Sequence, residues 1–340
     1  MADFIERVLE ICALDGTSGD ESTVRDYICS RISADEVTTD NLGNLLVFKK
    51  GRKTPKNRIM FAAHMDEVGF MVTDITEDGF LRFGAVGGVD PRVVLGRGLR
   101  FRNGIVGVVG TKAVHQQSEE ERKKAPEFTE MLIDIGASGR EEAEKLVQRG
   151  DCAVFDSDAF RFGDGFVKSK ALDDRAGCLI MMDMINGEPE YDAWYAFTVQ
   201  EEVGTRGAKA AAFTVEPDIA VVLETTTACD IPGSSGDKRV CELGKGCVVS
   251  FMDRGTIYDH ELYTIARSTA DNLGIPNQTK TVIAGGNDSG AIHVSRGGVR
   301  TCALSVPTRY LHSPSCTAKE SDIEATAKLA SAVLGAFAEL

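Results

Sequence analysis

The sequence predicts an α/β fold in which a mixed central sheet is flanked by helices and interrupted by an inserted β-barrel-like domain. Two changes in residue pattern along the 340 residues support this prediction. Helical periodicity leading into buried strands fills the first part of the chain and returns beyond residue 171, which is typical of an α/β sheet. Between them, residues 69–112 are dense in glycine and β-branched residues, which indicates a small barrel or sandwich.

The N-terminal part is predicted to alternate between helices and buried strands. Apolar positions place these elements at residues 4–12, 24–32, 45–48 and 59–63. Ser18, with Glu21 three residues later, predicts a capping box at the start of the second helix. The last strand leads directly to His64, the first candidate functional residue.

We expect residues 70–165 to form a separate β-rich domain inserted into an α/β domain made of residues 1–69 and 166–340. Glycines punctuate its short β-branched runs, and a short capped helix is expected at residues 138–148. The glycine-rich pattern of these strands differs from that of the strands in the α/β domain, so we do not expect them to join its sheet. We predict that they mediate dimerisation or oligomerisation.

Beyond residue 171 the alternation of predicted helices and buried strands returns and continues through residue 337. A helix is predicted around residues 179–184, and the final helix spans residues 323–337. Apolar runs predict three further buried strands, at residues 194–199, 219–223 and 301–306.

Composition excludes several classes of partner. The formal net charge is −14, from 52 acidic and 38 basic residues, and no run of Lys and Arg exceeds three. A nucleic-acid partner is not expected, because binding phosphates requires a basic face. A membrane partner is not expected either, because no apolar stretch approaches the ~18 residues that a membrane span requires.

The cysteines and the N-terminus predict a cytoplasmic protein. The nine cysteines are an odd number without a Cys-x-x-Cys pair, and most of them lie in apolar runs. They are expected to be small buried hydrophobic residues in a reducing compartment. The N-terminus shows no basic region followed by an apolar run and a cleavage site.

Five short segments place histidines or acids just beyond predicted strands, where open α/β sheets bind ligands. In the first, His64 could bind a metal ion through one ring nitrogen while Asp66, two residues later, holds the ring. The alternative for this His-x-Asp pair is a hydrogen-bonded pair in the core.

Pairs of adjacent acids form the second and third segments. One of the two carboxylates of Asp173 and Asp174 could bridge two metal ions, supported by the other carboxylate or by Arg175. The alternative is that both are acids at the N-terminus of a helix, which are common there. Glu201 and Glu202 follow an apolar strand, where a metal ion would offset their repulsion. One of them could ligate while the other stays free as a general base, and a solvated loop is the alternative.

The fourth and fifth segments supply one residue each. Glu224 follows a buried strand, and His312 lies in the loop after the last strand. A solvated acid and a surface histidine are the alternatives. The other three histidines are expected to be surface or packed residues: His115, His260 and His293.

Together the segments supply two histidines and three carboxylates, which suits two divalent metal ions that share a bridging Asp. Two ions ~3.5–4 Å apart can lower the pKa of a bridging water and polarise a scissile carbonyl. An unligated Glu beside them completes the proton-transfer machinery.

In their order and setting, four motifs resemble those of the metallo-aminopeptidases that include glutamyl aminopeptidase and the tetrahedral TET peptidases. They are AHMDEVG at 63–69, ALDDRAG at 171–177, TVQEEVG at 198–204 and RYLHS at 309–313. The loop at 285–289 also resembles a recurring loop of that family. The resemblance covers nearly the whole chain, including the inserted domain, and it implies a zinc-exopeptidase-like fold.

The resemblance also implies roles for single residues. Glu201 would be the catalytic base and Asp66 would orient His64, while Asp173 would bridge the two ions. The complete set of metal ligands would be His64, Asp173, Glu202, Glu224 and His312. Members of the family commonly carry Asp at the position of Glu224, so this ligand would reach the metal ion through a side chain that is one methylene longer.

From the resemblance we expect two divalent metal ions per subunit, zinc or cobalt, with manganese as an alternative. It also implies a cytosolic homo-oligomer, in many members a hollow tetrahedral dodecamer. The predicted function is hydrolysis of N-terminal residues from peptides by a water that two metal ions activate, with Glu201 as the general base.

Two other functions stay open. An endoglucanase-type glycoside hydrolase needs two carboxylates but leaves His64 and His312 unexplained. A non-catalytic scaffold on a peptidase fold would be expected to have lost a ligand or the base. The preferred N-terminal residue is not set by the sequence, and Arg254 and Arg309 are candidates for contacting an acidic side chain.

Overall fold

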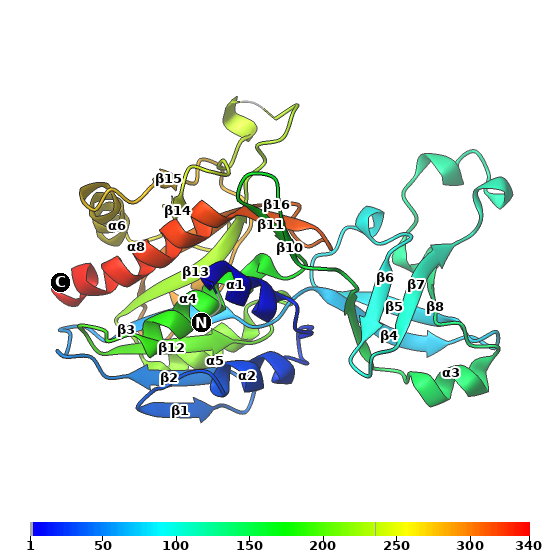
Figure 1. Ribbon diagram of the computed structural model, residues 1–340, viewed down its shortest axis with the longest axis horizontal. Coiled ribbons are helices and arrows are strands. Elements are labelled where there is room, and N and C mark those ends of the chain that lie inside the picture. The colour runs from blue at the N-terminus through cyan, green and yellow to red at the C-terminus, as the bar shows by residue number, and fades with distance from the viewer. Residues whose placement is uncertain (1–2, 235) are drawn as a thin grey trace.

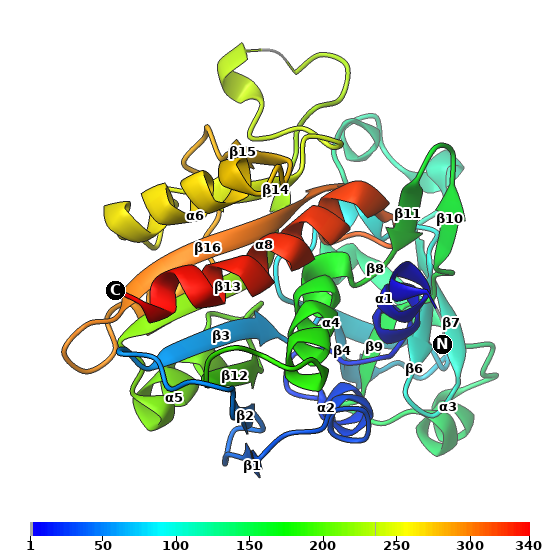
Figure 2. The same ribbon diagram turned by 60° about the vertical axis from the view of Figure 1, so that its left-hand side comes forward.

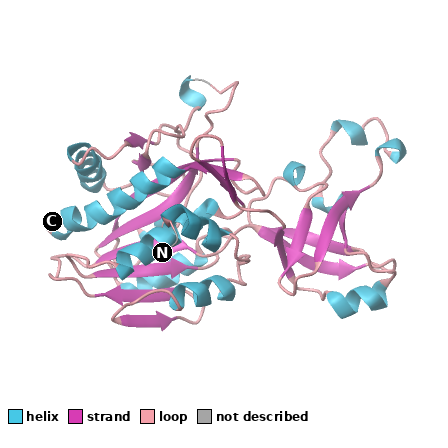
Figure 3. Ribbon diagram, viewed as in Figure 1, coloured by secondary structure: helices cyan, strands magenta, loops and turns pink. Residues whose placement is uncertain are grey.

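The computed structural model describes residues 3–234 and 236–340, which form two bodies (Figure 1). The larger body is an α/β domain with an 11-stranded mixed sheet, and the smaller is a closed barrel at the other end of the molecule. In Figure 3 the strands of the two bodies form two separate groups, and helices lie on the outside of the large sheet. The predicted fold class is confirmed. No described helix is long and apolar enough to cross a membrane.

The large sheet runs through the α/β domain and contains parallel and antiparallel pairs. Within the described residues its strands are β1 (Glu36–Thr39), β2 (Leu45–Lys49), β3 (Ile59–His64), β10 (Phe160–Phe162), β11 (Phe166–Ser169), β12 (Ala193–Thr198), β13 (Ile219–Thr227), β14 (Cys247–Ser250), β15 (Asn277–Thr279), β16 (Arg300–Arg309) and β17 (Cys316–Lys319). They are ordered β1-β2-β12-β3-β13-β16-β17-β11-β10, with β14 and β15 beside β16. The central strands β12, β3, β13 and β16 are parallel to one another.

Helices cover both faces of this sheet. Their bounds are α1 (Phe4–Cys12), α2 (Ser22–Cys29), α4 (Leu172–Asn186), α5 (Arg206–Val215), α6 (His260–Asn272), α7 (Ser289–Ile292) and α8 (Glu320–Ala338). Successive residues of β3 point to opposite faces: Phe61 joins the core beneath α4 and α8, and Met60 joins the core beneath α5. Figure 2 shows α4 and α8 lying across the first of these faces. Burial on both faces explains why the central strands are continuously apolar.

The smaller body is a barrel with a core of its own. Its strands are β4 (Gly69–Ile75), β5 (Leu81–Val86), β6 (Gly98–Phe101), β7 (Val106–Thr111), β8 (Met131–Asp134) and β9 (Cys152–Phe155), with α3 (Arg140–Leu146) against it. They close in the order β4-β5-β8-β7-β6-β9. Phe70 meets Phe83 and Phe155 edge-on inside the barrel. Gly107 is required in β7, since a Cβ there would lie 2.5 Å from a methyl group of Ile133.

Short 3-10 turns connect the barrel strands. They are η1 (Pro91–Val93), η2 (Val114–Gln116), η3 (Glu121–Lys123) and η4 (Phe128–Glu130), and η5 (Gly236–Lys238) lies in the α/β domain. The chain leaves the barrel after β9, and β10 already pairs with β11 of the large sheet. The division into domains at residues 69 and 165, and the role of the insertion in oligomerisation, stay predictions.

The predicted capping box at the second helix is wrong. α2 begins at Ser22 without a side-chain cap. The Ser18 hydroxyl instead donates to Asp66, and the Glu21 carboxylate accepts from the backbone N–H groups of Gly19 and Gln200. Glu21 therefore bonds directly to the turn after β12, and Ser18 bonds to Asp66, which in turn holds that turn.

Candidate active site

All seven predicted site residues come together at the carboxyl edge of the central parallel strands. His64 is the last residue of β3, and Glu201 and Glu202 follow β12. Asp173 lies at the start of α4, before the backbone becomes helical. Parallel strands end at a common edge, so residues far apart in sequence can meet there.

β13 and β16 bring Glu224 and His312 to the same edge. β13 is longer than predicted, because its residues 225–227 continue the parallel ladder with β16, so Glu224 lies inside the strand. His312 lies in the loop after β16. Both His312 and Gln200, the residue before Glu201, have φ of 56°, a left-handed conformation that is uncommon for residues other than glycine. Such conformations cluster at functional sites, and here they occur at the two turns that carry candidate ligands.

The carboxylate of Asp173 lies between the two histidine rings. Its Oδ1 is 3.4 Å from His64 Nε2, and its Oδ2 is 3.4 Å from His312 Nε2. Glu224 Oε1 is 3.6 Å from His64 Nε2, and Glu202 Oε2 is 3.2 Å from His312 Nε2. The five predicted ligands thus form two groups that share Asp173.

Backbone carbonyls orient both rings. His64 Nδ1 lies 3.0 Å from the carbonyl oxygen of Asp66, and His312 Nδ1 lies 2.9 Å from that of Gly88. If Nδ1 carries the proton and donates to the carbonyl, Nε2 is unprotonated. Its lone pair then points toward the carboxylates and is free to bind a metal ion. Gly88 belongs to the inserted body. The sequence did not identify it, because every residue has a backbone carbonyl group and the residue type therefore gives no signal.

The Asp66 side chain supports the site in a way that the sequence did not reveal. Its Oδ1 lies 3.5 Å from His64 Nδ1. It also accepts hydrogen bonds from the backbone N–H of Glu201 at 3.0 Å and, through Oδ2, from that of Glu202 at 3.1 Å. Asp66 therefore holds the turn with the two glutamates as well as lying beside the ring.

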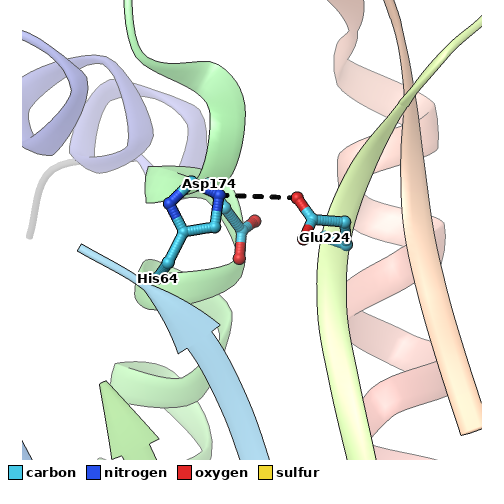
Figure 4. Close-up of side chains that lie close together, drawn as sticks. All are labelled: His64, Asp174 and Glu224. Carbon is cyan, nitrogen blue, oxygen red and sulfur yellow. Dashed lines mark ion pairs between the residues drawn. The ribbon is translucent and has the colours of Figure 1, made fainter. Parts of the chain in front are cut away.

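Asp174 is a further acid at this site. With His64 and Glu224 it forms a group whose potential ligand atoms lie within 4.8 Å of one another. Figure 4 shows its side chain beside the His64 ring, opposite Glu224. Its Oδ1 accepts a hydrogen bond from the N–H of Gly177, where a Cβ would lie 2.5 Å from that oxygen. Gly177 therefore allows the first turn of α4 to pack against this carboxylate.

A buried ion cluster lies behind the site. The Arg175 guanidinium is fully buried and donates to the carbonyl of Met65, between His64 and Asp66. Lys170 forms an ion pair with Glu67, and both side chains are buried. The sequence indicated Arg175 as support but gave no sign of the Lys170–Glu67 pair.

Burial and crowding of charge shift the pKa values of the site. Burial raises the pKa of Glu201 to about 10, with neighbouring carboxylates adding to the rise and His64 opposing it. Burial also raises the pKa of Glu202, and it raises that of Glu224 well above its usual range with the help of Asp173. Burial disfavours charge on Asp173 as well, but the two imidazoles hold its pKa well below the usual range. A positive charge at this site would therefore be strongly stabilised.

A cleft of ≈160 Å³ opens beside these residues. One part of its lining consists of Glu201 and four of the five candidate ligands, which are Asp173, Glu202, Glu224 and His312. Another part comes from Thr225, Lys280 and the loop of residues 284–287. The acids are thus reachable by a small molecule in the cleft.

Known proteins resemble this chain over almost its full length. A protein of Acetivibrio thermocellus that carries an aminopeptidase name is 42% identical over 331 residues, which cover 96% of this chain and 97% of that protein. The TET1 peptidase of Pyrococcus horikoshii, which can assemble into a tetrahedron or a large octahedral shell, is 36% identical with a TM-score of 0.85, over 97% of this chain and 99% of that chain. A Thermotoga maritima structure described as an endoglucanase is also 36% identical, with a TM-score of 0.81 over 97% and 98% of the two chains.

The family model described as M42 glutamyl aminopeptidase matches residues 43–329. This range contains the barrel, most of the α/β domain and every candidate residue from His64 to His312. The chain therefore belongs to the M42 glutamyl aminopeptidase family, a family of peptidases.

Proposed function

We propose that this peptidase is a metal-dependent aminopeptidase that releases single residues from the free amino end of peptides. The observation that carries the proposal is the Asp173 carboxylate, which directs one oxygen toward each of two histidine rings. A carboxylate in that position suits two divalent ions, as in two-metal hydrolytic sites.

The residues present fit such ions. Asp173 Oδ1 is buried and has no hydrogen-bond partner in the described structure. We assign His64 and Glu224 to one ion and His312 and Glu202 to the other, with Asp173 shared. Two imidazoles with carboxylates suit zinc or cobalt, with manganese as an alternative. When bound, the ions would lower the pKa of a water molecule and polarise the carbonyl of the first peptide bond.

Glu201 is the general base in this proposal. The Asp66 carboxylate accepts a hydrogen bond from the backbone N–H of Glu201 and so fixes the backbone there. The carboxyl group of Glu201 is thereby held beside the cleft. With cations bound, their positive charge would lower the pKa of Glu201, so that its carboxylate can accept one proton from the attacking water as the oxygen bonds to the carbonyl carbon. It then delivers that proton to the leaving nitrogen as the C–N bond breaks, which restores its starting charge.

A second candidate function is glycoside hydrolysis, favoured by the description of the Thermotoga maritima structure as an endoglucanase. The acids of the cleft would supply the two carboxylates that such a reaction requires. That function gives no role to the paired histidine rings on either side of Asp173. A non-catalytic scaffold would not require Glu201, which is present and adjoins the cleft.

We further propose that the protein is a cytoplasmic homo-oligomer, with a tetrahedral dodecamer as one candidate assembly. The support is the similarity to the TET1 peptidase, which forms closed shells. Assembly would restrict the site to peptides able to enter the shell, which is consistent with a small cleft.

The test is hydrolysis of amino-acid p-nitroanilides by protein that has been stripped by a chelator and reloaded with zinc, cobalt or manganese. We expect release of the anilide only after reloading, and no release from N-acetylated anilides, because an aminopeptidase requires the free amine. Cleavage of cellulose oligosaccharides without anilide hydrolysis would favour the glycosidase. Activity on neither substrate, with both ions bound, would favour the scaffold.

A further inference from the structure

A second cleft, of ≈550 Å³, adjoins the acidic cleft of the candidate active site. One of its walls is the loop of residues 310–315 between β16 and β17, and the other comes from residues 88–97 of the barrel. Three residues line both clefts: Thr227, Leu311 and His312. An extended molecule that lies against His312 can therefore occupy both clefts at once.

The two clefts differ in charge. Four acids line the first cleft, namely Asp173, Glu201, Glu202 and Glu224. The second cleft has one acid, Asp90, and that carboxylate forms an ion pair with Arg92. Among the residues that line the second cleft in the described part of the chain, Arg97 is the one Lys or Arg. The first cleft therefore suits a cation, whereas the second can receive an anion.

The Arg97 side chain is available to such an anion. Its Nε donates to the carbonyl oxygen of Val93 at 3.3 Å, and within residues 3–234 and 236–340 its terminal nitrogens have no acceptor and no ion pair. Other arginines of the barrel are already paired, since Arg92, Arg100 and Arg102 each contact an aspartate. A guanidinium group presents N–H donors in a planar fork that matches a carboxylate. Arg97 can therefore bind a carboxylate with both terminal nitrogens.

The loop that forms the opposite wall has an uncommon backbone conformation. Tyr310 and His312 have φ of 58° and 56°, and the Ser313 hydroxyl holds the loop by donating to the carbonyl of Tyr310 at 2.6 Å. Left-handed conformations of bulky residues are rare and cluster at functional sites. Tyr310 and Pro314 give this wall an apolar surface, which suits contact with a peptide chain.

The two arginines that the sequence suggested for contact with a substrate are not placed for it. Arg309 makes two hydrogen bonds to the Asp230 carboxylate. Arg254 is exposed, and its backbone N–H bonds to Gly285. Neither arginine lines either cleft.

We infer that the second cleft binds the part of the peptide that follows the scissile bond, and that Arg97 binds the C-terminal carboxylate of short peptides. This inference rests on the proposed aminopeptidase function. A peptide carries a positive charge at its amino end and a negative charge at its carboxyl end. The acidic cleft and Arg97 therefore suit the two ends, with the first peptide bond at His312, where the clefts meet.

The experiment compares short peptides that have a free C-terminal carboxylate with the same peptides carrying a C-terminal amide. The series is X-Ala, X-Ala-Ala and longer members, where X is the residue whose p-nitroanilide is cleaved best, and release of X gives kcat/KM. The carboxylate and the amide have nearly the same shape, so their ratio isolates the contribution of charge. We expect the parent enzyme to favour the free acid about fivefold at one short length, as for a solvent-exposed Arg–carboxylate pair. The ratio should fall toward one in longer peptides, whose carboxylate lies beyond Arg97.

Arg97→Gln should bring the ratio at that length to about one, whereas Arg97→Lys should keep part of it. Arg82→Gln is the matched control, because Arg82 is an exposed arginine of the barrel outside this cleft, and it should leave the ratio unchanged. A parent enzyme that cleaves acids and amides equally at every length would overturn the inference, and so would a preference for the acid that Arg97→Gln leaves unchanged. Failure to release X from any anilide or peptide would instead refute the aminopeptidase function itself.

Discussion

The carboxylate of Asp66 accepts three hydrogen bonds, from the backbone N–H groups of Glu201 and Glu202 and from the Ser18 hydroxyl. The backbone carbonyl of the same residue lies at hydrogen-bonding distance from His64 Nδ1. A single buried residue thus fixes both a histidine ring and the turn that carries two acids. Because Glu201 makes no contact of this kind through its own side chain in the described structure, its carboxyl group is available for chemistry.

Replacing Glu201 by Gln should reduce kcat by about 10²–10⁴-fold, the usual contribution of a positioned acid or base. The amide keeps the shape of the side chain but cannot accept the proton. Metal content measured by mass spectrometry should stay at the parent value, because Glu201 is not assigned as a ligand. Glu119→Gln, at an exposed site in the barrel, is the control. Substantial activity in a metal-loaded Glu201→Gln enzyme would place the base elsewhere.

Glu224 is the proposed ligand at the position where the family resemblance leads us to expect Asp. If it binds a metal ion, Glu224→Ala leaves that ion with His64 and the shared Asp173, too few protein donors for tight binding. After dialysis we expect about one ion per chain where the parent holds two, with activity returning at high added metal. Glu224→Asp should keep more metal than Glu224→Ala. Two tightly held ions in the Ala variant would remove Glu224 from the set of ligands.

At the scale of elements, α6 shows how a helix start is fixed and how it responds to pH. The Asp259 side chain accepts hydrogen bonds from the N–H groups of Glu261 and Leu262, and it pairs with Arg300 of β16. The bond from Arg300 is the main reason that the pKa of Asp259 lies below its ordinary value of 3.8. The charged form is therefore favoured in the folded protein, and its stabilisation is present above pH 3.8 and lost as the pH falls through the lowered pKa.

Asp259→Ala should lower the stability of the protein by about 1 kcal/mol, the usual effect of losing an N-cap. Asp259→Asn is the matched control, because Asn caps about as well but cannot pair with Arg300 as an anion. Differential scanning calorimetry at pH 7 should rank the parent above Asn and Asn above Ala. The gap between the parent and Asn should shrink as the pH falls below 3.8, and a gap independent of pH would contradict the role of the charge.

At the scale of the whole molecule, the barrel contributes to the site through the Gly88 carbonyl and presents its own outer surface. Val106 and Val108 of β7 point outward, 47% and 53% exposed, beside the exposed Gly110. These two valines form a small exposed apolar surface on one strand, which makes it a candidate contact surface. They are therefore the best place to test whether the inserted body mediates assembly.

The double variant Val106→Asp/Val108→Asp should form smaller particles than the parent, measured by size-exclusion chromatography with light scattering. The new charges would be buried without partners in a subunit contact, whereas they are harmless on an exposed surface. Val37→Asp, a similarly exposed valine on the edge strand β1, is the control outside the barrel. Particles of parental size in the double variant would show that this face of β7 is not part of the interface.

The fold class and the neighbourhood of the site could be predicted because their signals are local. Apolar runs and glycine-rich texture identify strands, helices and the barrel, and an acid or histidine at the end of a parallel strand lies at a known edge. These local signals identified His64, Glu224 and His312 and left a choice within the pairs Asp173/Asp174 and Glu201/Glu202. The family resemblance then selected Asp173 and Glu202, and the structure brings all five residues together.

Only the tertiary structure decided which partners those residues have. Ser18 and Glu21 look like a capping box in sequence, yet they bond to Asp66 and to the turn after β12, because those groups come within reach only in the folded chain. The Gly88 carbonyl comes from a different body of the fold, and a backbone group leaves no mark in a sequence. Lys280 is buried in the lining of the acidic cleft, and burial depends on how distant segments pack.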